Sequence, residues 1–237
     1  MSVPSLRARV RAETIEEIRA IARRHLATDG ANLSLRAVAR DAGLVPSALY
    51  RYFPSRDALL TALITDAYRS LAEAARATES AAARDDLPAR LVALAHGVRA
   101  WALDHPAEYA LIYGSPVPGY AAPAETVGPA SEVVLMLVGI LFEAVELGSR
   151  PRIPARPLPA VTAEEMRRLI EHGPGPRPEW TDPAPEDVLA VAFMLWSQLF
   201  GLVNFEVFGR LDLLIEARRE YFEHQVRVMG DLAGLGG

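Results

Sequence analysis

The chain has 237 residues, which is enough for one large domain or two small ones with a buried core. Hydrophobic residues make up 51% and charged residues 23%, as in ordinary globular proteins, so a disordered chain is excluded. No cysteine is present, which excludes disulfides, thiolate metal sites and thiol nucleophiles. Residues 1–17 contain Arg but no apolar run typical of a secretory signal, and we therefore expect a cytoplasmic protein.

Charge is divided unevenly along the chain. Residues 1–56 hold ten Arg against five acidic residues, a net charge of +5, whereas the other 181 residues carry a net charge of −10. A basic segment on a larger acidic body favours contact between that segment and a polyanion. Charge alone leaves open the alternative that the basic segment is a solvated surface.

The first helices are predicted by apolar spacing and by their end residues. Apolar residues recur at intervals of three and four between Ile15 and Leu26, which predicts a helix over about 8–28. Ser34 is a suitable N-cap for a second helix, and Gly43 is suited to end it because glycine tolerates a left-handed backbone.

A third, very short helix is expected to begin at Pro46, where the missing N–H of proline costs nothing. Successive helical residues are about 100° apart, so Leu49 and Phe53 face inward and Ser47 and Arg51 share the opposite face. Two short helices joined by a tight turn are typical of a helix-turn-helix motif. An ordinary helical hairpin with one solvated face is the alternative that spacing leaves open.

The rest of the chain is also predicted to be helical. Ser55 is a suitable cap for a long fourth helix. Residues 149–185 contain nine of the 18 prolines and are expected to form a long exposed connection with one helical patch near 162–172. No alternation typical of strands is found, and the predicted later helices are 88–104, 106–114, 125–148, 185–208 and 212–230.

The segment Ile15–Leu63 resembles the DNA-binding domain of TetR-family transcriptional regulators. The matching positions are Ser34-Leu35-Arg36, Val38-Ala39, Ala42-Gly43-Leu44, Leu49-Tyr50, Phe53, Ser55-Arg56 and Leu59-Leu60. Val45 departs from the family pattern, which usually has Ser or Thr there to cap the third helix. Arg56 replaces the usual Lys and keeps the charge. Trp196–Leu211 also resembles the tryptophan-glycine segment found in one TetR subgroup.

The resemblance implies an all-α fold with two domains. Residues 8–56 are expected to form an N-terminal three-helix helix-turn-helix DNA-binding domain, and residues 57–237 a larger helical ligand-binding and dimerisation domain that includes the 149–185 loop. It also implies a homodimer that binds a palindromic site in double-stranded DNA, with reading helices roughly 34 Å apart. Repression and control by a small-molecule effector are further expectations from the family.

The residues expected to contact DNA are assigned by their chemistry. Side chains with hydroxyl or guanidinium groups suit phosphates, and Arg51 suits the O6 and N7 atoms of guanine. The candidates are Ser34, Arg36, Val45, Pro46, Ser47, Tyr50, Arg51, Tyr52 and Arg56, in which Ser34, Tyr50, Tyr52 and Arg56 are assigned to phosphates and Ser47 and Arg51 to base edges. Arg7, Arg9 and Arg11 are expected either to reach the DNA backbone or minor groove or to remain solvated.

The middle helices are expected to supply the ligand pocket, and the family resemblance implies that the last two long helices pair with their copies as a four-helix bundle. Residues 188–205 contain no charge, but Ser197, Gln198 and Asn204 interrupt the run, so we expect a buried helix rather than a membrane span. A stripe from Leu211, Leu214 and Ile215 to Met229 is predicted for the last helix. Aromatic and apolar residues with a few polar ones are candidates for ligand contacts, although a core role is the alternative for each. The candidates are His96, Trp101, Tyr109, Tyr113, Met136, Phe142, Glu143, Phe193, Trp196, Gln198 and Asn204.

Two other functions were weighed against DNA-binding regulation. An all-α enzyme would need catalytic or metal-binding residues, but His25, His96, His105, His172 and His224 show no metal-ligand spacing, so no catalytic residue, metal or cofactor is expected. A non-specific architectural DNA-binding protein is disfavoured because the larger part of the chain is acidic.

Overall fold

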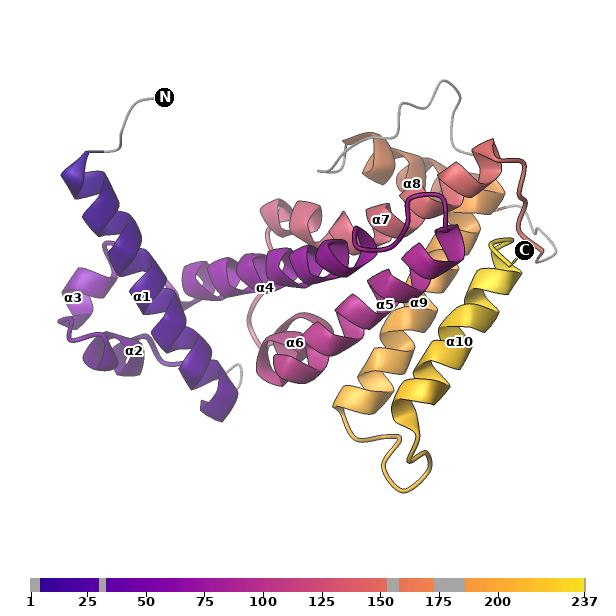
Figure 1. The fold of residues 1–237 in the computed structure, drawn as a ribbon. Coiled ribbons are helices and arrows are strands. Elements are labelled where there is room, and N and C mark those ends of the chain that lie inside the picture. Colours follow the sequence, from indigo (N-terminus) through magenta and orange to yellow (C-terminus); the bar gives the residue numbers. More distant parts are fainter. Residues whose placement is uncertain (1–4, 30–32, 153–157, 173–185, 237) are drawn as a thin grey trace. The chain divides into compact units, whose positions relative to one another are not determined.

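The computed structural model describes residues 5–29, 33–152, 158–172 and 186–236, and all regular elements in these ranges are helices, which confirms the all-α prediction. Figure 1 shows the chain as a ribbon. The elements are α1 (Leu6–Asp29), α2 (Leu35–Asp41), α3 (Pro46–Leu49), α4 (Arg56–Glu79), α5 (Leu87–Asp104), α6 (Pro106–Tyr113), the 3-10 helix η2 (Ala124–Thr126), α7 (Val127–Glu146), α8 (Ala160–His172), α9 (Glu186–Val207) and α10 (Arg218–Leu232).

The chain divides into two compact units, which we describe separately. The head unit contains Met1–Ala67 and His105–Thr126, and the body unit contains Tyr68–Asp104 and Val127–Gly237. The boundary expected after residue 56 therefore differs from the division by compactness. The first twelve residues of α4 and the whole of α6 belong to the head unit.

The head unit has one apolar core. Ile18 from α1, Val38 from α2, Leu49 from α3 and Leu59 from α4 are fully buried in it. Val117, which follows α6, joins the same core, and α6 packs against α1. The amphipathic spacing seen in the sequence thus buries one face of each of the first four helices.

The N-termini of α2 and α4 have the predicted capping residues. The Ser34 hydroxyl accepts a hydrogen bond from the Ala37 N–H at 3.4 Å, and the Ser55 hydroxyl accepts one from the Ala58 N–H at 3.0 Å. Gly43 has φ +65°, a left-handed conformation that side chains with a Cβ disfavour. The turn between α2 and α3 is therefore fixed by local chemistry.

In the body unit, α5, α9 and α10 pack against one another, and α7 packs extensively on α9 (Figure 1). Both α7 and α9 are long and apolar enough to cross a membrane, but half or more of the most apolar part of each is buried against protein. Val188, Leu195 and Leu199 of α9 are among the buried residues. Both are core helices of the body unit; the charge-free run 188–205 predicted this for α9, whereas no such prediction was made for α7.

The start of the last helix differs from the prediction. We expected a helix over 212–230, but α10 begins at Arg218 and residues 208–214 form turns. Leu213 has φ +65° and is fully exposed, and Leu214 is also exposed, so neither can continue a helical stripe. In the proline-rich region, α8 agrees with the predicted helical patch, whereas 153–157 and 173–185 lie outside the described residues.

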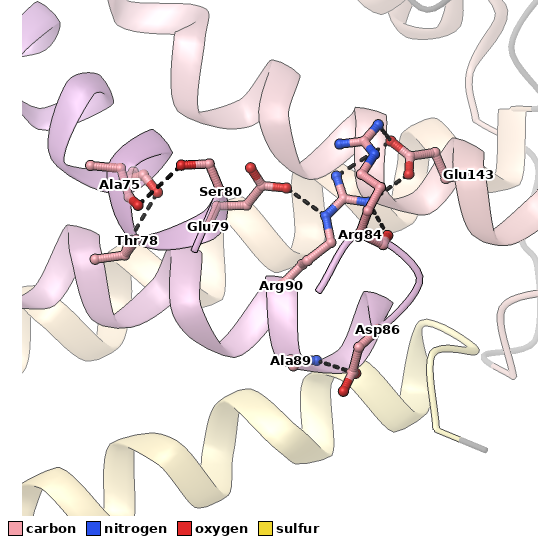
Figure 2. Close-up of polar contacts among 10 residues, drawn as sticks. Ala75, Thr78, Glu79, Ser80, Arg84, Asp86, Ala89, Arg90 and Glu143 are labelled. Carbon is pink, nitrogen blue, oxygen red and sulfur yellow. Dashed lines mark hydrogen bonds and ion pairs between the residues drawn. The ribbon is translucent and has the colours of Figure 1, made fainter. Parts of the chain in front are cut away.

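A cluster of acidic and basic side chains links α4, α5 and α7 within the body unit (Figure 2). Arg90 of α5 is buried and donates to Glu79 of α4 at 2.6 Å and to Glu143 of α7 at 2.5 Å. It also donates to the Arg84 carbonyl at 3.2 Å, and the exposed Arg84 guanidinium reaches Glu143 at 2.5 Å. Two carboxylates thus face two guanidinium groups, which offsets the cost of burying charge.

Removing the buried guanidinium should be costly. We expect Arg90→Ala to lower the free energy of unfolding by about 3–5 kcal/mol, because it leaves two partly buried carboxylates without their main partner. Arg84→Ala is the matched control and should cost about 1 kcal/mol or less, since Arg84 is 75% exposed at the same carboxylate. Urea denaturation measures both values. Equal losses in the two variants would contradict the assignment.

Candidate nucleic-acid interface

The recognition segment, residues Pro46–Phe53, begins with a four-residue helix. Val45 is extended at φ −69° and ψ 144° and provides no side-chain cap, as its departure from the family pattern predicted, and Pro46 occupies the first turn. Beyond Leu49 the chain continues in turns, and the Phe53 N–H donates to the Leu49 carbonyl at 3.0 Å. The segment therefore remains helix-like for about two turns.

The two faces of this segment have opposite character. Leu49 is fully buried and Phe53 is 6% exposed, whereas Ser47, Tyr50 and Arg51 are exposed. This is the arrangement that helical spacing predicted. The hydroxyl of Ser47, the phenol of Tyr50 and the guanidinium of Arg51 are thus exposed, while Leu49 and Phe53 are buried. This arrangement suits a helix that enters a major groove.

The other residues expected to contact DNA differ in exposure. Ser34, Arg36, Val45 and Pro46 are exposed, while Tyr52 and Arg56 are half-buried. The Arg56 guanidinium lies 3.9 Å from the carboxylate of its neighbour Asp57. All nine residues lie on one stretch of the head unit, and their roles in binding remain predictions.

Arg11 of α1 lies against the recognition segment. Its guanidinium carbon is 5.0 Å from the centroid of the Tyr52 ring, and its Nη2 donates to the Arg51 carbonyl at 3.3 Å. The sequence leaves two alternatives for Arg11, DNA contact or solvation, and neither includes a partner within the protein. No local pattern could have indicated it, because forty residues separate the bonded pair.

A second link joins α1 to α2. The His25 Nε2 atom lies 2.7 Å from Asp41 Oδ2, and Arg40 contacts the other oxygen of the same carboxylate at 3.1 Å. These hydrogen bonds, the one from His25 first, hold the pKa of Asp41 below its ordinary value. Asp41 is therefore a charged brace between α1 and α2.

Of the residues proposed for ligand contact, Tyr109 and Tyr113 belong to the head unit rather than to the body unit. Their rings are 5.2 Å apart, and burial raises the pKa of Tyr109 above its ordinary value. From the sequence, all the ligand candidates are expected in one domain, residues 57–237, whereas the structure divides them between the two units.

The remaining candidates lie in the body unit in different environments. Glu143 belongs to the charge cluster of Figure 2, and Gln198 is exposed. The Trp101 indole donates to Ser70 at 2.9 Å. The Trp196 ring makes edge-on contacts with the rings of Phe193 and Phe200. The Asn204 side chain donates to the Phe200 carbonyl at 3.0 Å. Met136 is half-buried, and Phe142 is buried.

His96 is placed beside charged and aromatic neighbours. Its Nε2 atom lies 3.5 Å from a Glu223 oxygen, and its ring packs on Phe222. Burial lowers the pKa of His96, and the neighbouring carboxylate only partly opposes this effect. Among the described residues, no cluster of His, Asp or Glu has the arrangement of a metal site.

Comparison with known proteins identifies the family. Residues 18–63 match the model described as bacterial regulatory proteins of the tetR family, and residues 91–229 match the model described as a tetracyclin repressor-like C-terminal domain. The chain belongs to the TetR family. As a TetR-family helix-turn-helix transcriptional regulator, it has DNA as its partner.

Relatives of this TetR-family chain extend over nearly its whole length. It is 37% identical to the HTH-type transcriptional regulator Rv1816 of Mycobacterium tuberculosis over 88% of this chain and 87% of the relative. The solved structure of regulatory protein SCO4313 has a TM-score of 0.72 at 34% identity and covers 96% of this chain and 98% of that chain. A protein of unknown function from Rhodococcus sp. RHA1 shares the fold, with a TM-score of 0.67 at 24% identity over 91% and 93% of the two chains.

The Asp41 brace should make the stability of the head unit depend on pH. Because the folded pKa of Asp41 lies below the ordinary value of 3.8, the ionised carboxylate stabilises the folded state fully above 3.8, and this stabilisation is lost progressively as the pH falls from there through the lower folded pKa. Asp41→Asn should therefore lower the melting temperature at neutral pH, and its difference from the unsubstituted protein should shrink below about pH 4.

Thermal melts between neutral pH and about pH 3 measure this difference. Glu17→Gln is the control, since Glu17 is an exposed carboxylate of the same unit and should show little effect at any pH. A difference for Asp41→Asn that stayed constant down to the lowest pH would contradict an electrostatic brace.

Proposed function

We propose that this TetR-family regulator is a cytoplasmic, homodimeric repressor that reads a palindromic DNA site and is controlled by a small apolar or amphipathic molecule. The observation that carries the proposal is the recognition segment, in which Leu49 and Phe53 are buried and Ser47 and Arg51 are exposed. A side chain can discriminate between bases only if its backbone is held in place. The family description as tetracyclin repressor-like supports repression.

Each contact to DNA has a role set by its chemistry. The Ser34 hydroxyl, at the start of α2, and the Tyr50, Tyr52 and Arg56 side chains suit phosphate oxygens, and such contacts fix register without reading sequence. Arg51 has the planar fork of donors that matches guanine, and Ser47 can reach an adjacent base edge. Arg36, Val45 and Pro46 flank this surface and are expected to pack beside the sugar-phosphate backbone.

Arg51→Ala should mainly relax sequence preference. We expect it to reduce discrimination at one base pair of the site by about 1–3 kcal/mol, because a bidentate contact to guanine is lost. Ser34→Ala and Arg56→Ala are the matched controls and should weaken binding to all duplexes by similar factors. The site is first selected from randomised DNA, and affinities for single-base variants are then measured. The reverse pattern among the three variants would contradict the roles assigned here.

An exposed apolar stripe on α9 supports the homodimer. Met194 and Phe205 of α9 are exposed, and with Gly201 they recur at the spacing of one helical face; Phe208, just beyond the end of α9, is also exposed. A Cβ at Gly201 would meet nothing within 4 Å, so this part of the stripe has room for another helix to approach. Exposed apolar stripes of this kind mark interaction surfaces, and a palindromic site requires two-fold symmetry.

A charge on this stripe should separate the protomers. Phe205→Glu places a carboxylate where two apolar helices are expected to meet, and we expect a monomer at micromolar concentration by light scattering. Val161→Glu is the control, because Val161 is 71% exposed on α8 and lies outside the stripe, so this variant should remain a dimer. A monomeric unsubstituted protein, or a dimeric Phe205→Glu variant, would argue against this interface.

Control by a small molecule is supported by the family and by the composition of the body unit. Aromatic side chains such as Trp101, Phe142 and Trp196 occur there beside a few polar groups. RolR, a protein of the same fold with a TM-score of 0.54 at 13% identity, was solved in complex with resorcinol. A ligand that binds one dimer geometry more tightly would change DNA affinity by that difference in binding free energy.

A further inference from the structure

The recognition segment has little intrinsic stability at either end. Its helix has four residues, which is far below the length at which a helix persists by itself, and Val45 caps no N–H at its start. At the other end, the N–H groups of Arg51, Tyr52 and Phe53 donate to carbonyls of Ala48 and Leu49. The carbonyls that follow Leu49 must find partners elsewhere.

Arg11 supplies such a partner from α1. Its Nη2 donates to the Arg51 carbonyl at 3.3 Å, and the same guanidinium lies over the Tyr52 ring at 5.0 Å. Two consecutive residues of the segment are therefore held by one side chain. A hydrogen bond to the main chain and a cation–π contact act on different atoms, so together they restrict both translation and rotation of the turn.

We infer that Arg11 is a positioning residue for DNA reading, which acts by fixing the backbone of Arg51 rather than by contacting DNA itself. This inference rests on the proposed role of Arg51 in reading a base. The direction in which the Arg51 side chain leaves the segment depends on its main chain, whose carbonyl is bonded to Arg11. A shift of about 1 Å at the reading residue is enough to spoil a bidentate contact.

A direct contact between Arg11 and phosphate makes a different prediction. Each phosphate neutralised by a cation contributes about 0.9 to the slope of log affinity against log salt concentration. Loss of a positioning residue changes discrimination between sequences and leaves this slope unchanged. The two mechanisms are therefore separable in a single set of binding curves.

The test compares Arg11→Ala with Arg7→Ala, which removes the same charge from an exposed position one turn earlier on α1. Affinities are measured for the selected site and for its single-base variants at several salt concentrations. We expect Arg11→Ala to reduce discrimination at the base pair read by Arg51 about fivefold with an unchanged salt slope, and Arg7→Ala to leave the discrimination intact. A slope lowered by about 0.9 with intact discrimination, or no change in either quantity, would overturn the inference.

A measurement without DNA separates this inference from the proposed function. Aromatic ring currents should shift the Arg11 δ-methylene protons in the NMR spectrum of the free protein. Tyr52→Phe should keep the shift because it keeps the ring, and Tyr52→Leu should abolish it, while melting temperatures show that both variants fold. Absence of the shift in the unsubstituted protein overturns the inference even if the protein reads DNA. Absence of any sequence preference in the unsubstituted protein overturns the proposed function instead.

Discussion

The burial of Leu49 and Phe53 is the contact on which the DNA-reading surface depends. Four helical residues supply too few internal hydrogen bonds to offset the entropy of fixing their backbone, so α3 exists because the head core holds it. Once these two positions are fixed inward, helical geometry places Ser47 and Arg51 outward. The eight residues of the recognition segment, 46–53, thus supply both the exposed side chains of the reading surface and two of the side chains buried in the core.

The body unit meets a different constraint, because its central helices are apolar on most of their surface. Apolar helices pack in many registers at similar cost, whereas a buried charge has a partner in only a few. Arg90 between Glu79 and Glu143 sets the register of α5 against α4 and α7. Arg99 sets the register of α5 against α9, because its guanidinium donates to both carboxylate oxygens of the buried Glu206, at 2.7 and 2.5 Å.

Local features were predictable from the sequence, and long-range ones were not. The caps at Ser34 and Ser55 and the turn at Gly43 follow from chemistry within four residues of each position, and all three were found. The start of α10 was missed because Leu213 adopts a left-handed conformation that no leucine signals in advance. Glu143 was expected beside a ligand, but its partner Arg90 lies 53 residues away. The spacing within one helix contains no information about such pairs.

The same limit applies to charge. The net charge of +5 over residues 1–56 counts every Arg as available to a polyanion. Several of these Arg side chains have partners within the head unit: Arg19 pairs with Glu16 and Asp66, Arg40 with Asp41, and Arg11 with the recognition segment. Counterion release depends on cations that reach phosphates, so these residues contribute less to DNA affinity than their number indicates. Their contribution lies in holding α1 and α2 in place, and α1 in turn supplies part of the support for the residues that read the bases.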